Sequence, residues 1–208
     1  MSESILWYVH DPMCSWCWGF RPAHDALLAD LNGAVPVRRL LGGLAPDSEH
    51  PMAEDMQAYL QDTWRRIQTR VPGTRFNFDF WTNTTPRRST WPACRAVIAA
   101  RAQDPSLDDA MVHAIQRAYY LEARNPSDPD TLTELAAGLG IDTAAFSTAM
   151  NSTMVRETFA QERESARILG AHSFPSLVLE AGGTHHPISI DYTRPEAMSA
   201  QIHSALAG

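Results

Sequence analysis

The pattern of hydrophobic positions changes its period twice near the start of the chain. Ile5 to His10 has the length and the branched and aromatic side chains of a buried strand. Apolar residues then recur at helical spacing from about Ser15 until Asn32-Gly33, a pair that favours the left-handed conformation in which many helices end. Val35 to Leu41 again has the character of a strand. Because a helix-length segment separates the two strands, we expect them to be parallel and joined by a right-handed crossover.

A long helical region follows. From Pro51 to about Leu169 the pattern is helical nearly throughout, which predicts an inserted all-helical segment. Methionines and aromatic residues repeat at helical spacing as far as Pro72-Gly73, and such a stripe usually packs into a core. Phe76 to Trp81 alternates apolar and polar residues, and we expect it to form an extended connector. Further helices are predicted over Ser106–Leu121, Asp130–Leu139, Thr143–Met150 and Ser152–Leu169.

The chain then returns to strands. An apolar run extends from Pro175 to Leu179, and proline is acceptable at the first residue of a strand. Gly182-Gly183 predicts a hairpin turn into a further strand over Thr184–Ile190. A last helix is predicted from Thr193 to Leu206. Two strands, a helical insertion, two strands and a helix together predict a mixed α/β fold.

Two cysteines three residues apart lie between the first strand and the first helix. The first turn of a helix has N–H groups without partners inside the helix, and the helix dipole adds partial positive charge, so a thiol at that end ionises more easily. Cys14 would occupy the outermost position, and Cys17 would lie one turn further in on the same face, at a separation that a disulfide tolerates. We therefore expect Cys14 to be the attacking thiolate and Cys17 to resolve the mixed disulfide.

Three interpretations of this pair stay open. A Cys-x-x-Cys between a strand and a helix is typical of a thioredoxin-like redox dithiol. In the second interpretation, the pair is half of a zinc site. The chain has no other Cys-x-x-Cys, so only Cys94 and the pair His185-His186 remain to complete the four ligands. The third is a structural pair, since buried free cysteines often fill cores. Cys94 itself lies in a predicted helix near alanines, which favours a buried and unreactive thiol.

Met13 to Phe20, taken with Ser173 to Leu179, resembles the thioredoxin-like disulfide oxidoreductases of the DsbA type, and most closely their cytoplasmic, FrnE-like branch. The resemblance runs over nearly the whole chain. It implies a thioredoxin-like fold with a large inserted all-helical domain, in which residues 1–44 and 171–208 form a discontinuous thioredoxin-like domain and residues 45–170 form the insertion. It also implies that Pro175 follows a cis peptide bond and lies against the dithiol.

Five residues are candidates for contact with a substrate. In the resembling proteins, the segment that matches Ser89, Thr90 and Pro92 comes over the dithiol and helps to line the substrate cleft. Trp16 lies between the two cysteines, and Phe174 directly precedes Pro175, where its backbone can pair with an extended substrate chain. A capped helix start beside a solvated arginine cluster explains residues 87–92 equally well.

His10 and Asp11 directly precede the dithiol. A histidine cation would favour ionisation of Cys14 and an aspartate would oppose it, so both are candidates for tuning the pKa of the site. A plain turn built on Asp11-Pro12 accounts for the same residues. The resemblance departs at Tyr8, because many thioredoxin-like enzymes carry a buried acid there that helps proton transfer. His10, Asp11 or water would have to serve instead.

Composition narrows the set of partners. The chain has 17 lysine and arginine residues, all of them arginine, against 24 aspartates and glutamates, which gives a net charge of −7. This balance argues against nucleic acid or an anionic membrane as the main partner. The first residues lack the positive charge and the long apolar run of a signal peptide. We therefore expect a cytoplasmic protein whose thiols are kept reduced.

These features predict a thiol–disulfide oxidoreductase or protein disulfide isomerase. Its substrate would be a protein or small molecule that contains a thiol or a disulfide, and its cysteines would need no metal or cofactor. Glutathione as a cosubstrate and a homodimer are both compatible with the sequence. The same fold also hosts glutathione-dependent isomerases and kappa-type glutathione transferases, which typically have serine where Cys14 stands. A metal-binding or partner-recruiting module is a further hypothesis.

Overall fold

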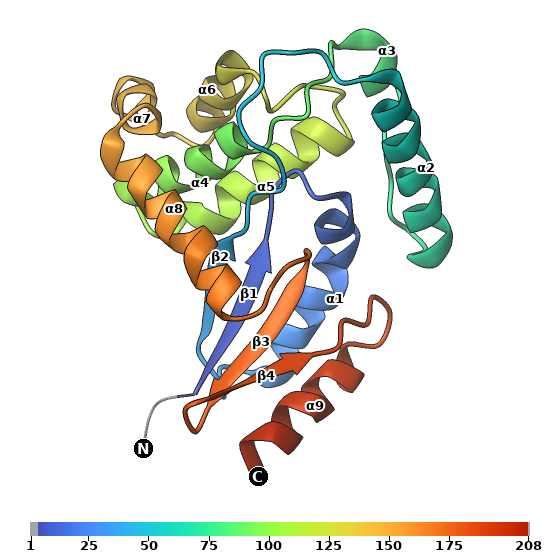
Figure 1. Ribbon diagram of the computed structural model, residues 1–208, viewed down its shortest axis with the longest axis vertical. Coiled ribbons are helices and arrows are strands. Elements are labelled where there is room, and N and C mark those ends of the chain that lie inside the picture. Colours follow the sequence, from blue (N-terminus) through green and yellow to red (C-terminus); the bar gives the residue numbers. More distant parts are fainter. Residues whose placement is uncertain (1–3, 208) are drawn as a thin grey trace.

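A mixed sheet of four strands lies at the centre of the computed structural model, which describes residues 4–207 (Figure 1). The strand order is β2-β1-β3-β4, with β1 parallel to β2 and antiparallel to β3, and β3 antiparallel to β4. The strands are β1 (Ile5–His10), β2 (Val37–Leu41), β3 (Ser176–Ala181) and β4 (Thr184–Ile188). The parallel pairing of the first two strands, joined by one helix, agrees with the prediction from their spacing.

Helices cover both faces of this sheet because successive side chains of a strand point to opposite sides. Leu6 and Tyr8 of β1 face α1 (Ser15–Leu31) and α9 (Pro195–Ala207) in one buried cluster. Val9 of β1 faces the opposite side, where it packs in a second cluster with residues near the end of α8 (Thr153–Ile168). The sheet therefore forms the middle of three layers.

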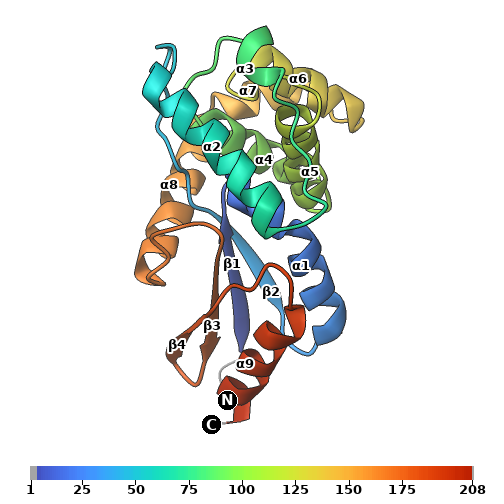
Figure 2. The same cartoon turned by 90° about the vertical axis from the view of Figure 1, so that its right-hand side faces the viewer.

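Most of the helices between β2 and β3 gather beyond one end of the sheet, whereas α8 runs back along one of its faces (Figures 1 and 2). Besides α8, they are α2 (Glu54–Arg70), α3 (Phe80–Asn83), α4 (Trp91–Gln103), α5 (Leu107–Tyr120), α6 (Pro129–Gly138) and α7 (Thr143–Met150). A long helical insertion is thus present, as the periodicity predicts. The division into residues 1–44 with 171–208 and residues 45–170 stays a prediction, since α8 belongs to the insertion yet packs on the sheet.

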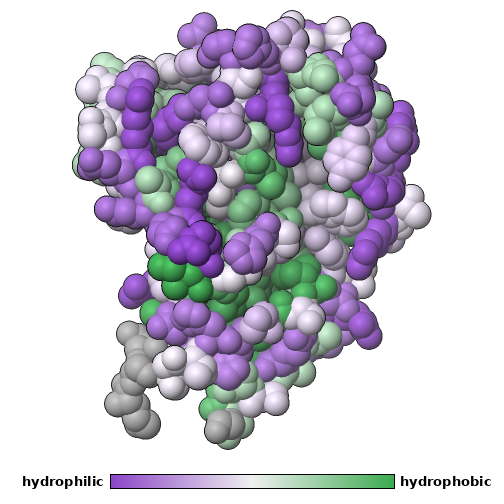
Figure 3. Space-filling model, viewed as in Figure 1, coloured by the Kyte–Doolittle hydropathy of each residue, from purple (hydrophilic) through white to green (hydrophobic). Residues whose placement is uncertain are grey.

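Trp64 of α2 is the centre of the aromatic core in the helical part. Its side chain is fully buried, and its ring stacks on Phe76 at 4.8 Å and contacts Tyr119 and Tyr120, both at 5.6 Å between centroids. Hydrophobic residues also gather on the surface across the middle of one face, where the helices meet the sheet (Figure 3). Apolar packing therefore joins α2 to α5 and continues toward the sheet.

One predicted element differs from the structure. The alternation over Phe76–Trp81 predicts an extended connector, but its last residues form the start of α3, and Phe78 and Trp81 lie against Trp64 at 5.5 and 4.9 Å. Burial of several rings against one tryptophan outweighs the weak preference of a short alternating segment. No helix within residues 4–207 combines the length and the apolar character needed to cross a bilayer.

Candidate active site

Cys14 lies at the N-terminus of α1, directly after the turn that ends β1. Its backbone N–H donates to the Asp11 carbonyl at 3.0 Å, and its own carbonyl accepts the first helical hydrogen bond from Trp18 at 3.0 Å. The residue is the N-cap of the helix, in extended conformation, and its sulfur does not cap the helix. The thiol is therefore placed at the end of α1 where backbone N–H groups favour an anion.

Cys17 lies one turn further along α1, close to Cys14. Both thiols are free; Cys14 is 5% exposed and Cys17 is 0% exposed. Burial raises the pKa of the Cys17 thiol well above its usual value, and hydrogen bonding with Cys14 and the charge of that sulfur raise it further. Cys14 is thus the more accessible sulfur, and Cys17 is held as a protonated thiol beside it.

The chain reaches the dithiol a second time just before β3. The Phe174–Pro175 peptide bond is cis, and the Cys14 Sγ lies 3.4 Å from the Phe174 carbonyl oxygen, to which the thiol donates. The Phe174 ring packs so closely on Gly42 that a Cβ at that glycine would lie 1.9 Å from the ring. The position of the Phe174 ring therefore requires glycine at residue 42.

Asp11 connects the dithiol turn to two other segments. Its fully buried carboxylate accepts hydrogen bonds from the backbone N–H groups of Met13 and Leu44, each at 2.8 Å, and from the Thr90 hydroxyl at 2.7 Å. Burial raises the pKa of Asp11, whereas these hydrogen bonds oppose the rise. The carboxylate is therefore a structural link between β1, the loop after β2 and the start of α4, and it lies beneath the dithiol.

Ser89, Thr90 and Pro92, the residues that the resemblance places at a substrate cleft, lie at and just before the start of α4. All three are buried, and the Thr90 hydroxyl is engaged by Asp11 and by the Ala45 N–H at 3.1 Å. The Ser89 hydroxyl accepts from the Ser48 N–H at 3.2 Å. Contact of these side chains with a substrate stays a prediction, and in the structure Thr90 supports the dithiol turn through its hydrogen bond to Asp11. Thr90 also makes no side-chain cap on α4, since its hydroxyl is directed to Asp11.

His10 is a neutral aromatic residue in the folded protein. Its ring stacks on Tyr8 at 4.7 Å, it is 2% exposed, and neither ring nitrogen has a hydrogen-bond partner among the residues that the structure describes. Burial, together with the positive charge of Arg39, lowers the pKa of His10 to about 3. The expected tuning of Cys14 by a histidine cation is therefore corrected at neutral pH.

This burial makes His10 a source of acid sensitivity. Because its pKa falls from 6.5 to about 3 on folding, the folded protein binds fewer protons, so stability is lost as pH falls through this window. At pH 4.5 the loss from this group is roughly 3 kcal/mol. We expect His10→Phe, which keeps an aromatic ring but cannot bind a proton, to remove most of this acid-induced loss. The measurement compares the free energy of urea unfolding at pH 7.5 with that at pH 4.5. The exposed His185→Gln should leave it unchanged, and equal acid sensitivity of His10→Phe and wild type would contradict the prediction.

Cys94 is fully buried, as the sequence predicts. Its thiol donates to the Asp11 carboxylate at 3.7 Å, and burial together with the charge of Asp11 raises its pKa well above the usual value. No group of three or more histidine, cysteine, aspartate or glutamate side chains within residues 4–207 is arranged to hold a metal ion. The Cys94 thiol therefore belongs to the hydrogen-bond network under the dithiol.

Trp16 lies on the outer side of the dithiol with two residues that the sequence analysis missed. Its half-buried ring contacts Tyr192 at 5.3 Å, and the Arg70 guanidinium lies over both rings, 5.9 Å from Trp16 and 5.6 Å from Tyr192. Arg70 ends α2 and Tyr192 precedes α9. No sequence motif marks either residue, because only the fold brings these three segments together.

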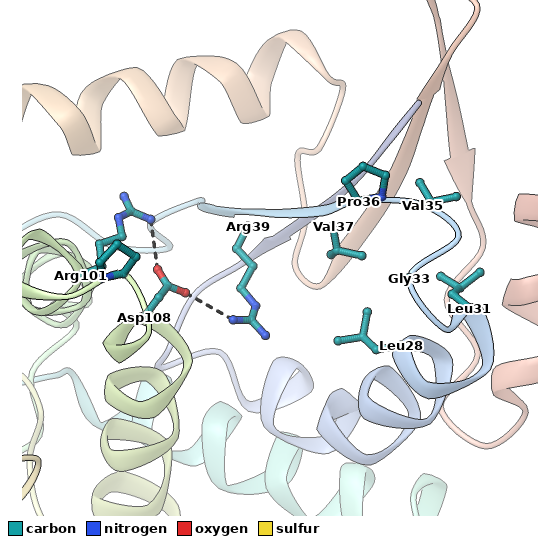
Figure 4. A pocket seen from close by; sticks show the side chains of 10 residues that line it. Leu28, Leu31, Gly33, Val35, Pro36, Val37, Arg39, Arg101 and Asp108 are labelled. Carbon is teal, nitrogen blue, oxygen red and sulfur yellow. Dashed lines mark hydrogen bonds and ion pairs between the residues drawn. The ribbon is translucent and has the colours of Figure 1, made fainter. Parts of the chain in front are cut away.

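A cavity of about 580 Å³ lies away from this cluster, between the C-terminal part of α1, the start of α5 and β2 (Figure 4). Its walls are largely apolar, and its charged residues pair with one another. Asp108 lies 3.1 Å from Arg101 and 3.6 Å from Arg39, and Arg101 also pairs with Glu162. The charges in this cavity are therefore already compensated.

The sheet order, the dithiol at the start of α1 and the neighbouring proline define a protein of thioredoxin-like architecture. Residues 7–190 match a family model described as thioredoxin, and the chain belongs to this family. Its similarity to solved disulfide oxidoreductases supports assignment to the thiol–disulfide oxidoreductases.

Two solved structures are similar over almost their full length. A candidate protein disulfide isomerase from Nitrosomonas europaea has 28% identity and a TM-score of 0.85, with 99% of this chain and 98% of that chain covered. The cytosolic disulfide reductase DsbM from Pseudomonas aeruginosa has 30% identity and a TM-score of 0.77, with 98% of each chain covered.

A curated relative is more distant. The ClpXP adapter protein SpxH of Halalkalibacterium halodurans is 21% identical over 173 residues, which cover 81% of this chain and 56% of that protein. The chain therefore spans little more than half the length of this relative.

Proposed function

We propose that the protein exchanges thiols and disulfides through a mixed disulfide formed by Cys14. The observation that carries this proposal is the position of the Cys14 sulfur, at the N-terminus of α1, beside the free Cys17 thiol and 3.4 Å from the Phe174 carbonyl. The helix end favours the thiolate. The Phe174 backbone offers a hydrogen-bonding edge to an extended substrate.

The reaction proceeds in two exchanges. The Cys14 thiolate attacks one sulfur of a substrate disulfide, so a Cys14–substrate S–S bond forms and the substrate S–S bond breaks, releasing one thiolate. Cys17 then gives up its proton and attacks the Cys14 sulfur, which forms the Cys14–Cys17 disulfide and releases the second substrate thiolate. The dithiol is oxidised by two electrons, and the substrate disulfide is reduced to two thiols. Two molecules of a small thiol reverse these steps and restore the dithiol.

The substrate class proposed here is a small-molecule or protein thiol or disulfide. A structure of the Pseudomonas aeruginosa DsbM with GSH, 28% identical and with a TM-score of 0.74, supports glutathione as one such molecule. The description of that protein as a cytosolic reductase supports work in a reducing compartment, where the free cysteines would be maintained. For this chain, we propose both glutathione as a substrate and a reducing compartment as its place of work.

A trapping experiment tests the mechanism. We expect Cys17→Ala to accumulate a stable disulfide between Cys14 and the substrate, because the thiol that would resolve it is absent. Purified Cys17→Ala treated with glutathione disulfide should gain the mass of one glutathione moiety, and dithiothreitol should remove it. The matched control is Cys94→Ala, which keeps both members of the dithiol and should gain no lasting adduct. A Cys17→Ala protein that never forms an adduct would refute Cys14 as the attacking thiol.

A further inference from the structure

Arg70 presents its positive charge beside the dithiol turn. It is exposed in the last turn of α2, and its guanidinium lies over Trp16, the residue between Ser15 and Cys17. The Tyr192 ring contacts Trp16, and the same guanidinium lies 5.6 Å from its centroid. Two aromatic rings therefore hold a cation at the outer side of the dithiol, while the N–H groups of the guanidinium stay available at its edge.

This charge has no acidic partner among residues 4–207. In a chain with 24 acidic and 17 basic side chains, most arginines are paired, as Arg39 and Arg101 are in the cavity of Figure 4. Arg70 forms no ion pair of 4.0 Å or less with a described residue. A guanidinium left uncompensated next to the reactive cysteines suits a ligand that brings its own carboxylate.

A cavity adjoins the Arg70 cluster on the side of α1. It has a volume of about 610 Å³, and its walls include Trp18, Tyr192 and the loop that directly follows Arg70, residues 71–75. The exposed Arg75 also lines it, and no acidic residue within the described chain pairs with Arg75. The space is large enough for a short peptide. Its lining also holds Arg21 and Asp25, which pair with each other, so Arg75 is the cation in this wall that has no described acidic partner.

We infer that Arg70, held by Trp16 and Tyr192, selects disulfides that carry carboxylates, such as a short acidic peptide joined through its cysteine. This inference rests on the proposed thiol–disulfide exchange and names its substrate class. A carboxylate bound to the guanidinium would place the attached disulfide over the start of α1, where Cys14 lies. A neutral disulfide would react without this contact and therefore with a lower rate constant.

Single-turnover reduction of two disulfides of different charge tests the inference. Reduced protein is mixed with glutathione disulfide, which is acidic, or with hydroxyethyl disulfide, which is neutral, and oxidation of the dithiol is followed by acid quench and mass analysis. We expect Arg70→Gln to lower the rate constant for glutathione disulfide roughly tenfold and to change that for hydroxyethyl disulfide less than about twofold. Added salt should slow the wild type on the acidic substrate and affect Arg70→Gln little.

Two further variants complete the test. Arg70→Lys keeps the charge and should retain most of the preference for the acidic disulfide. Arg38→Gln is the matched control, because Arg38 is also exposed, also lies over a tryptophan ring (Trp7, 5.8 Å) and forms no ion pair with a described residue, but it belongs to β2. It should leave both rates unchanged.

The outcomes separate the inference from the proposed function. If Arg70→Gln slows both disulfides equally, or slows neither, charge selection by Arg70 is wrong while thiol–disulfide exchange stands. If the reduced wild type oxidises with neither disulfide, the proposed function is refuted and the inference with it.

Discussion

Cys14→Ser will abolish disulfide exchange, lowering the rate at least about 10³-fold. A serine oxygen at this position cannot form the S–S bond on which every later step depends, and Cys17, with 0% exposure and a raised pKa, cannot replace it as the first nucleophile. Reduction of insulin, followed by turbidity in the presence of dithiothreitol, measures the effect. The single-turnover reaction with glutathione disulfide measures the same loss without a second reductant.

Cys94→Ser is the control for this prediction. It also exchanges one buried sulfur for oxygen, but that sulfur belongs to the Asp11 network and not to the exchanging pair. Its activity should stay within a few-fold of wild type. Substantial turnover by a folded Cys14→Ser protein would show that another group makes the first attack.

Asp11→Ala will cost about 4 kcal/mol of unfolding free energy. The substitution leaves the N–H groups of Met13 and Leu44 and the hydroxyl of Thr90 without their buried acceptor. It also removes the connection among three segments that are far apart in the sequence. Thermal unfolding should show a fall in Tm of roughly 8–16 °C for a domain of this size.

Asp11→Asn and Thr90→Val provide the matched comparison for this loss. Asparagine keeps one acceptor oxygen, so Asp11→Asn should lose about half as much stability as Asp11→Ala. Combined with Asp11→Ala, Thr90→Val should add less than its own separate cost, because the two residues share one hydrogen bond. An Asp11→Ala protein with unchanged Tm would show that the buried carboxylate does not stabilise the fold.

Local patterns predict much of this fold because each strand and helix has its own hydrophobic period. The parallel pairing of β1 with β2 follows from a helix-length spacing, and the left-handed end of α1 at Asn32, with φ 44°, follows from the Asn32-Gly33 signal. Thr143–Met150 forms α7 with the predicted bounds. The prediction of an extended connector over Phe76–Trp81 is wrong because its rings pack against Trp64. The alternation within a six-residue segment does not encode this contact.

The candidate site was only partly predictable for the same reason. Cys14 and Cys17 lie within one motif, so their proximity follows from helix geometry. The burial of His10 and the use of the Thr90 hydroxyl by Asp11 depend on packing between elements, so local patterns suggested a histidine cation that the fold does not form and did not indicate the hydrogen bond between Thr90 and Asp11. Arg70 and Tyr192 carry no local signal, and the tertiary fold alone brings them to Trp16.

The raised pKa of Cys17 has a consequence for the order of events. Part of the rise comes from the neighbouring Cys14 sulfur and its charge. Once Cys14 is bonded to a substrate, that charge no longer exists, so the Cys17 proton becomes easier to remove at the moment when its sulfur is needed. Cys17 therefore stays protonated while Cys14 is a free thiolate. Formation of the mixed disulfide lowers the barrier to deprotonation of Cys17, whose attack then releases the substrate.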